Sequence, residues 1–178
     1  MKTKKIPTET TLLIVLKNMQ ILLAKKKRGF GKGKFNGVGG KIQSGETNEN
    51  AMIREAQEEI GITPIQYEKV AEITFDEIFD KGVHEEILMH VFLAEKYSGT
   101  PIETDEMKPF WFNLNEIPYD QMFKDDIFWL PLVLSGKKIR ANFELDENFN
   151  VKSHTLEILN NKFISHNSFE QDKNVFEK

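Results

Sequence analysis

Three glutamates are spaced so that a helix would carry their carboxylates on one side of a single turn. Glu55, Glu58 and Glu59 are related as i, i+3 and i+4, and residues at those spacings are neighbours on a helix surface. Like charges so placed repel by roughly a few tenths of a kcal/mol per pair, which predicts a compensating cation. Because all the donors are oxygens, without histidine or cysteine, the pattern favours Mg²⁺ or Mn²⁺. A bare Glu-x-x-Glu-Glu is also typical of a solvated helix face. The residues around it must therefore distinguish a metal site from an ordinary charged surface.

The residues around these glutamates predict one helix that can position them. Thr47 or Asn48 can serve as its N-cap, and Gly61 can end it. Apolar residues within the segment follow helical spacing, namely Met52, Ile53, Ala56 and Ile60. One face of the helix would therefore be buried, and the acidic face would be left for the site.

A longer motif encloses the acidic helix. Its eight fixed positions are Gly40, Glu46, Arg54, Glu55, Glu58, Glu59, Gly61 and the aliphatic Ile62. This spacing is the Nudix box, and the chain resembles the Nudix hydrolases, which cleave nucleoside diphosphates linked to another group. Ala56 stands where a larger aliphatic residue is usual in the family, but alanine can still face a core there.

The segment before the helix, residues 25–40, is rich in both glycine and lysine. It can be a solvated loop in which the glycines only provide turns. Alternatively, its backbone amides and lysines can hold phosphate oxygens next to the acidic helix. It is neither a dinucleotide fingerprint nor a P-loop, because Asn36 replaces a required glycine and Gly-Lys-Ser/Thr is absent.

The rest of the chain predicts mainly strands, as β-rich runs bounded by turn residues. The expected strands are Thr10–Leu16 and Ile21–Lys26 as a hairpin, Tyr67–Phe75, Ile87–Ala94, a short buried Phe110–Phe112, and Lys138–Leu145 with Val151–Ile158 as a closing hairpin. We expect loops over residues 76–86 and 100–109, the second leaving Glu106 exposed. Asp125 or Asp126 can cap a helix that begins at Ile127.

Length and composition are those of an ordinary globular protein. The 178 residues fit one domain, which we place at residues 1–159, followed by a polar tail at 160–178 that we expect to be frayed. A net charge of −4 argues against a nucleic-acid backbone as partner, so we expect the partner to be a small-molecule nucleotide. We also expect no membrane association and a monomer. Zero cysteines suit a reducing cytoplasm, and the apolar run at residues 12–16 is too short for a membrane span.

Beyond the box, residues 11–159 resemble one branch of the family, the MutT-type oxidised purine nucleoside triphosphate diphosphatases. The matching stretches are residues 26–31, 36–41, 99–107, 111–112 and 125–129. The resemblance implies a Nudix fold of the α/β (α+β) class, an α/β/α sandwich around a mixed β-sheet. It also implies that water attacks a phosphate and yields a nucleoside monophosphate and pyrophosphate.

The same resemblance implies roles for individual positions. The catalytic set is Arg54, Glu55, Glu58 and Glu59. The metal ligands are Glu55, Glu58, Glu59, Glu106 and the carbonyl of Gly39, with Mg²⁺, or Mn²⁺, as the ion. The substrate-binding set is Thr11, Lys26, Phe30, Asn36, Gly40, Lys41, Phe123, Asp125, Asp126 and Trp129. Vertebrate members have a tryptophan at the position of Phe123, so the stacking area here is smaller.

The hydrogen-bonding capacity of three side chains agrees with the base contacts that the resemblance implies. Asn36 can donate and accept at once, which suits a purine edge. Asp125 and Asp126 can do the same if one carboxylate stays protonated, and repulsion with desolvation can arrange that.

The expected function is therefore sanitation of the nucleotide pool by hydrolysis of 8-oxo-dGTP and related oxidised purine nucleotides, with 2-hydroxy-dATP as a further candidate. A broader Nudix pyrophosphohydrolase would use the same metal site on ordinary nucleotides, dinucleoside polyphosphates or capped RNA. A third alternative is a nucleotide-binding module without catalysis. Against it stand Arg54 and the three glutamates, since a sensor would not need them all.

Overall fold

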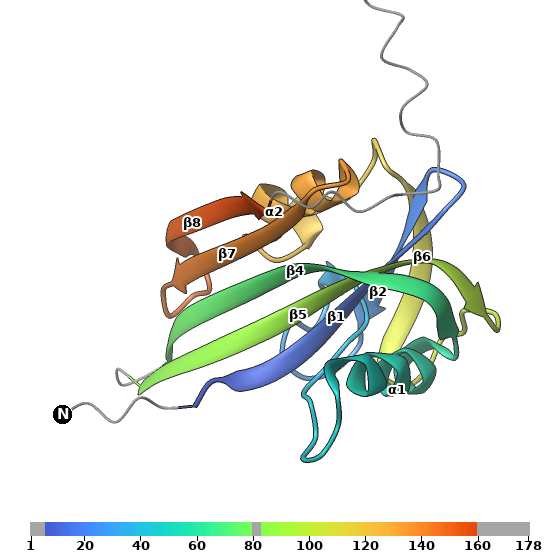
Figure 1. Cartoon of the computed structure of the whole chain (residues 1–178), viewed down its shortest axis with the longest axis horizontal. Helices are drawn as coiled ribbons and strands as arrows, with labels where there is room; N and C mark the ends of the chain where they lie inside the picture. The colour runs from blue at the N-terminus through green and yellow to red at the C-terminus, as the bar shows by residue number, and fades with distance from the viewer. Residues whose placement is uncertain (1–5, 80–82, 160–178) are drawn as a thin grey trace, which may run out of the picture.

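A computed structural model describes residues 6–79 and 83–159 and shows a central mixed sheet between helices (Figure 1). Its strands are β1 (Thr8–Lys17), β2 (Gln20–Lys26), β3 (Phe35–Asn36), β4 (Thr63–Phe79), β5 (Val83–Ser98), β6 (Met107–Asn113), β7 (Lys138–Leu145) and β8 (Val151–Leu159). The helices are α1 (Asn48–Ile60), the short 3₁₀-helix η1 (Tyr119–Gln121) and α2 (Asp126–Leu134). The strand order is β3-β2-β1-β5-β4-β7-β8, and β6 pairs with β2. Strands β1 and β5 are parallel, as are β4 and β7, while the other pairs are antiparallel.

Strand β1 is buried on both faces, which explains its uninterrupted apolar sequence. Leu12, Ile14 and Leu16 belong to the same core cluster as the buried residues of α2. Leu13 and Val15 belong to the second cluster, with the apolar face of α1. Helices α1 and α2 lie on opposite faces of the sheet in Figure 1, and the expected α/β/α sandwich is confirmed.

The caps of α1 are those that its sequence predicts. The hydroxyl Oγ1 of Thr47 accepts a hydrogen bond from the backbone N–H of Asn50 at 3.1 Å, so Thr47 is the N-cap. Gly61 ends the helix in the left-handed conformation, with φ of 73°. Ala56 is fully buried, so the small residue in the motif does face the core.

Three expectations about local structure are wrong or incomplete. Residues 76–79 and 83–86, expected as parts of a loop, are instead strand residues, because β4 and β5 continue as a paired ladder to Phe79 and Val83; residues 80–82 lie outside the described residues. The ladder is made by hydrogen bonds between backbone groups, and charged side chains do not remove those groups. The loop expected over residues 100–109 is shorter, because β6 already begins at Met107. The predicted strand Phe110–Phe112 is part of this longer β6, which pairs with β2 alone among the described strands, and Phe110 is 37% exposed where burial was expected.

The hairpins β1–β2 and β7–β8 are confirmed. The expected tail at residues 160–178 lies outside the described residues. Within residues 6–79 and 83–159, no helix is long and apolar enough to cross a membrane.

Candidate active site

The loop that precedes α1 lies directly against β1. The N–H of Thr11 donates to the carbonyl of Gly40 at 2.9 Å, and the N–H of Leu13 donates to the carbonyl of Val38 at 2.7 Å. A Cβ atom on Gly39 would stand 2.0 Å from the carbonyl oxygen of Thr11. Glycine is therefore required for this close approach, which fixes the backbone of the loop beside the acidic helix.

Arg54 connects the loop to the glutamates of α1. Its guanidinium donates to both carboxylate oxygens of Glu46, at 2.7 and 3.0 Å, and to the carbonyl of Lys41 at 3.1 Å. It also donates to Glu55 at 2.6 Å and to Glu58 at 3.2 Å. The hydrogen bonds from Arg54 lower the pKa of Glu46 to about 2. Arg54 thus neutralises and orients two of the three glutamates.

Glu59 is the buried member of the three, with 3% of its surface exposed. Its Oε2 accepts a hydrogen bond from the N–H of Gly39 at 2.9 Å, and Lys26 Nζ lies 3.9 Å from Oε1. Burial raises the pKa of Glu59 to about 7, against the opposing effects of Gly39 and Lys26. A carboxylate in this environment gains strongly from a further cation.

Glu106 lies in a bend just before β6 and is partly exposed. Its carboxylate accepts a hydrogen bond from Arg28, and its carbonyl accepts one from the N–H of Lys27 at 2.8 Å. Thr104 Oγ1 donates to the carbonyl of Glu59 at 2.8 Å, which ties this loop to the end of α1. The predicted loop position is confirmed, and the negative charge of Glu106 contributes to the raised pKa of Glu59.

The oxygen donors of the site suit a divalent metal ion, but the positions of the carboxylates do not form a coordination site. Among the described residues, no three acidic or histidine side chains form a ready-made metal site. The donors near the loop are all hard oxygens, and they suit a divalent ion such as Mg²⁺. Instead of converging, the carboxylates are paired with cations: Glu55 with Arg54, Glu59 with Lys26, and Glu106 with Arg28.

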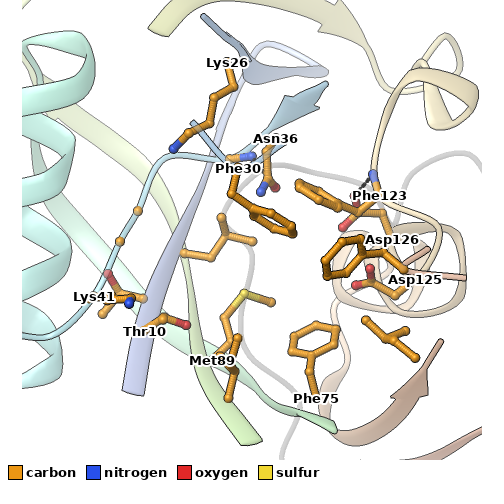
Figure 2. A pocket seen from close by; sticks show the side chains of 18 of the residues that line it. Thr10, Lys26, Phe30, Asn36, Lys41, Phe75, Met89, Phe123, Asp125 and Asp126 are labelled. Atoms are coloured by element: carbon orange, nitrogen blue, oxygen red, sulfur yellow. Dashed lines mark hydrogen bonds between the residues drawn. The ribbon is translucent and has the colours of Figure 1, made fainter. Parts of the chain in front are cut away.

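A cavity of about 270 Å³ opens beside this loop (Figure 2). Figure 2 shows Lys26 and Asn36 at the top of the cavity, Asp125 and Asp126 at its right, and Met89 with Phe75 at the bottom of the view. Ten residues expected at the site line it: Thr11, Lys26, Phe30, Asn36, Gly39, Gly40, Lys41, Phe123, Asp125 and Asp126. The hydroxyl of Thr11 is buried without a partner among the described residues.

Asp125 and Asp126 do not cap α2 as expected. Asp125 precedes the helix, but its side chain makes no capping hydrogen bond; it accepts from Trp129 Nε1 at 3.0 Å. Asp126 Oδ2 accepts from the N–H of Phe123 at 3.0 Å. Both are buried, at 6% and 3% exposed, because the start of α2 faces the cavity instead of solvent.

Burial changes the protonation of this pair. It raises the pKa of Asp125 to about 6. Burial, and then the charge of Asp125, raise the pKa of Asp126 well above its ordinary value. The pair therefore retains a proton more readily than aspartates in water, so one carboxyl can donate while the other accepts.

Asn36 is oriented by its own loop. Its Oδ1 accepts a hydrogen bond from the N–H of Gly37 at 2.8 Å, so its amide nitrogen is left as the donor toward the cavity. Trp129 differs from the expectation: it is fully buried and does not line the cavity. Its indole acts on the site through the aspartate pair: it donates to Asp125 and also opposes the rise in the pKa of Asp126.

Sequence reasoning missed the apolar part of the cavity. The missed residues with large apolar side chains are Leu12, Phe75, Ile87, Met89, Met107, Leu145 and Phe149. Alternation along β4 and β5 does place Phe75, Ile87 and Met89 on inward faces. That signal cannot separate a pocket wall from a packed core, and Phe149 lies in a polar turn that gives no signal at all.

Fold and site together define an α/β/α protein with the acidic helix of a metal-dependent phosphohydrolase beside an apolar pocket. Comparison with known proteins shows which family of this class the chain is similar to. A profile of the NUDIX domain matches residues 7–132. Two curated oxidized purine nucleoside triphosphate hydrolases are similar over most of their lengths. The one from Danio rerio is 44% identical and that from Mus musculus 41%, over 83% and 82% of this chain and 92% of each relative.

Solved structures agree with the sequence relatives. A MutT protein from Bacillus halodurans superposes with a TM-score of 0.76 at 27% identity, over 84% of this chain and 97% of its own. The chain belongs to the Nudix family. Hydrolases of this family generally need a divalent metal.

Proposed function

We propose that this chain hydrolyses oxidised purine nucleoside triphosphates, namely 8-oxo-dGTP and, as a further candidate, 2-hydroxy-dATP, with Mg²⁺. The products are the nucleoside monophosphate and pyrophosphate. One observation carries the proposal: the buried pair Asp125 and Asp126 lines the same cavity as the loop held by Glu59 of the acidic helix. The similarity to hydrolases of this specificity in two vertebrates supports it.

Recognition of the base follows from the protonation of the aspartate pair. An oxidised guanine and an oxidised adenine present different donor and acceptor patterns on the edge that enters the pocket. With one proton shared, Asp125 and Asp126 can match either pattern by moving that proton. Asn36 adds a fixed donor from another side of the cavity, so the pocket favours bases with a matching acceptor.

The chemistry at the phosphates rests on the acidic helix. Glu55, Glu58, Glu59, Glu106 and the Gly39 carbonyl would hold Mg²⁺, which neutralises phosphate charge and lowers the pKa of water when bound. The water oxygen forms a bond to the phosphorus on one side of the α–β bridge, and the bond from that phosphorus to the bridging oxygen breaks. The other phosphate group leaves with the bridging oxygen and the bonding electrons, and a glutamate of the site accepts the water proton. Arg54 keeps Glu55 and Glu58 in register for this step.

Steady-state kinetics test the proposal. We would measure kcat/KM with Mg²⁺ for 8-oxo-dGTP, 2-hydroxy-dATP, dGTP and a dinucleoside polyphosphate. An oxidised purine nucleotide should be the best substrate, and pyrophosphate should be the second product. If dGTP equals or exceeds every oxidised substrate, the sanitising function is wrong. If the dinucleoside polyphosphate is preferred, the broader pyrophosphohydrolase is the right function.

We also propose that the protein works as a monomer in the cytoplasm, with a small-molecule nucleotide as its partner. The support is that the cavity and the acidic helix are both formed within one chain, and that cysteines are absent. Light scattering during size-exclusion chromatography would test the monomer, because a mass of about twice 20.7 kDa would contradict it.

A further inference from the structure

The turn between β7 and β8, residues 146–150, is held in one shape by Asp146. Its carboxylate accepts hydrogen bonds from the backbone N–H of Asn148 at 2.8 Å and of Asn150 at 2.9 Å. The Asn150 amide donates to it as well, at 3.0 Å for Oδ2. The N–H of Phe149 donates to the carbonyl of Asp146 at 2.9 Å. The turn is therefore ordered by itself, before any ligand is considered.

Phe149 has an unusual backbone in this turn. Its φ of 59° lies in the left-handed region, where a bulky residue other than glycine is an outlier that its surroundings must maintain. The neighbours Asn148 and Asn150 are of a type that tolerates this region better. An aromatic residue at the strained position suggests that its ring is needed where the turn places it.

The ring of Phe149 contacts an aromatic residue from a distant loop. Its centroid lies 4.9 Å from that of Phe30, with the planes at 67°, in an edge-to-face arrangement. Phe30 in turn stacks on Phe123, with centroids 5.5 Å apart and planes at 22°. All three residues line the cavity, and Phe30 and Phe123 lie side by side in Figure 2.

The distance between the rings of Phe30 and Phe123 determines whether a base can bind between them or only against one side. Two rings that clamp a flat base must be about 7 Å apart, since each layer of contacts takes about 3.5 Å. At 5.5 Å, Phe30 and Phe123 admit no base between them, so they form one wall. Phe30 is 58% exposed, and Phe149 packs against it.

We propose that Phe149 is a specificity-determining residue, which holds Phe30 against Phe123 so that the aromatic wall presents enough area to prefer two-ring bases. This proposal rests on the proposed function, because it concerns the base of the same substrate. The larger a flat base, the more of the wall it covers, and stacking strength follows the covered area. Loss of the ring should therefore penalise purines more than pyrimidines.

Two substitutions separate the ring from the strained backbone. F149A removes the ring, and F149G removes the ring and relieves the strain. The conservative variant F149Y keeps the ring, and F128A removes a partly exposed ring of α2 that does not line the cavity. We would measure KM and kcat for 8-oxo-dGTP and for dCTP, and the Kd of the product 8-oxo-dGMP by calorimetry.

Both F149A and F149G should raise KM for 8-oxo-dGTP and the Kd of 8-oxo-dGMP by about three- to tenfold, as expected for one lost aromatic contact. Values of kcat should stay within about twofold, because the acidic helix is not touched, and dCTP should be affected less. F149Y and F128A should behave as wild type.

Unchanged KM and Kd in both ring-deleted variants would overturn the proposal, as would a loss confined to kcat, or one seen in F149A but not in F149G. The wild-type arm reports on the proposed function separately. If wild type binds 8-oxo-dGMP without hydrolysing the triphosphate, the proposed function fails, while the Kd ratios still decide the role of Phe149.

Discussion

The buried carboxyl of Asp125 should make the stability of the protein depend on pH in a way that one substitution removes. Asp125 is 6% exposed and accepts a hydrogen bond from Trp129. An asparagine in its place (D125N) has nearly the same shape and can still accept that bond through Oδ1, but carries no charge. The change therefore isolates the free energy of burying the ionised carboxylate.

The sign and size follow from the pKa of Asp125, which burial raises from 3.8 to about 6. Between these values the folded state binds more protons than the unfolded state, so the free energy of unfolding falls as pH rises. At about 1.4 kcal/mol per pH unit, the full loss is about 3 kcal/mol. The protein retains this contribution below pH 3.8 and loses it as pH passes about 6. In D125N the loss is absent, and Asp126 also loses a repulsive neighbour.

Urea unfolding followed by circular dichroism at pH 4.5, 6.0 and 7.5 would measure this effect. The free energy of unfolding of D125N, minus that of wild type, should increase by about 2 kcal/mol from pH 4.5 to 7.5. D120N is the matched control, because Asp120 is exposed and its carboxylate meets water in both states. A D125N difference that stays constant within about 0.5 kcal/mol over this range would refute the argument, because it would mean that the carboxyl is not desolvated.

Four further substitutions test other parts of the structure. E58Q should abolish metal-dependent turnover but leave the circular dichroism spectrum unchanged, since the Glu58 side chain is 60% exposed; near-normal activity would remove Glu58 from the site. D126A should lower the ratio of kcat/KM for 8-oxo-dGTP over dGTP by tenfold or more, as hydrogen bonds to charged groups contribute about 1.5–3 kcal/mol; an unchanged ratio would rule out the aspartate pair as the selector. T47A should reduce the free energy of unfolding by about 1 kcal/mol in urea titrations, because it removes the N-cap of α1, and no loss would mean that the cap is replaced by water. G39A should destabilise the protein more than T47A does, because its Cβ would stand 2.0 Å from a backbone oxygen of β1; equal thermal midpoints for G39A and wild type would show that the loop can move away.

The sequence predicts correctly those parts of the structure that depend on contacts between residues close together in the chain. The caps of α1, its buried face and the spacing of its glutamates depend on contacts inside one helix and the adjacent loop. Strand β1 could likewise be placed, because an apolar run between turn residues has few other solutions. Contacts across long sequence separations could not be predicted in this way: the family resemblance implied that Glu106 belongs to the metal site, but nothing in the sequence predicted its contact with Arg28.

The aspartate pair shows why local rules fail at the other end of the site. An aspartate before a helix normally caps it, since water and the first-turn amides are its only partners. At the start of α2 the core supplies different partners: the indole of Trp129 approaches Asp125, and the N–H of Phe123 binds Asp126. Both carboxyls are thereby drawn out of water, and their pKa values rise. Two adjacent carboxyls and the family resemblance indicate that such a pair can share a proton. The burial that holds a proton on the pair near neutral pH comes from tertiary packing, which neither residue type nor spacing encodes.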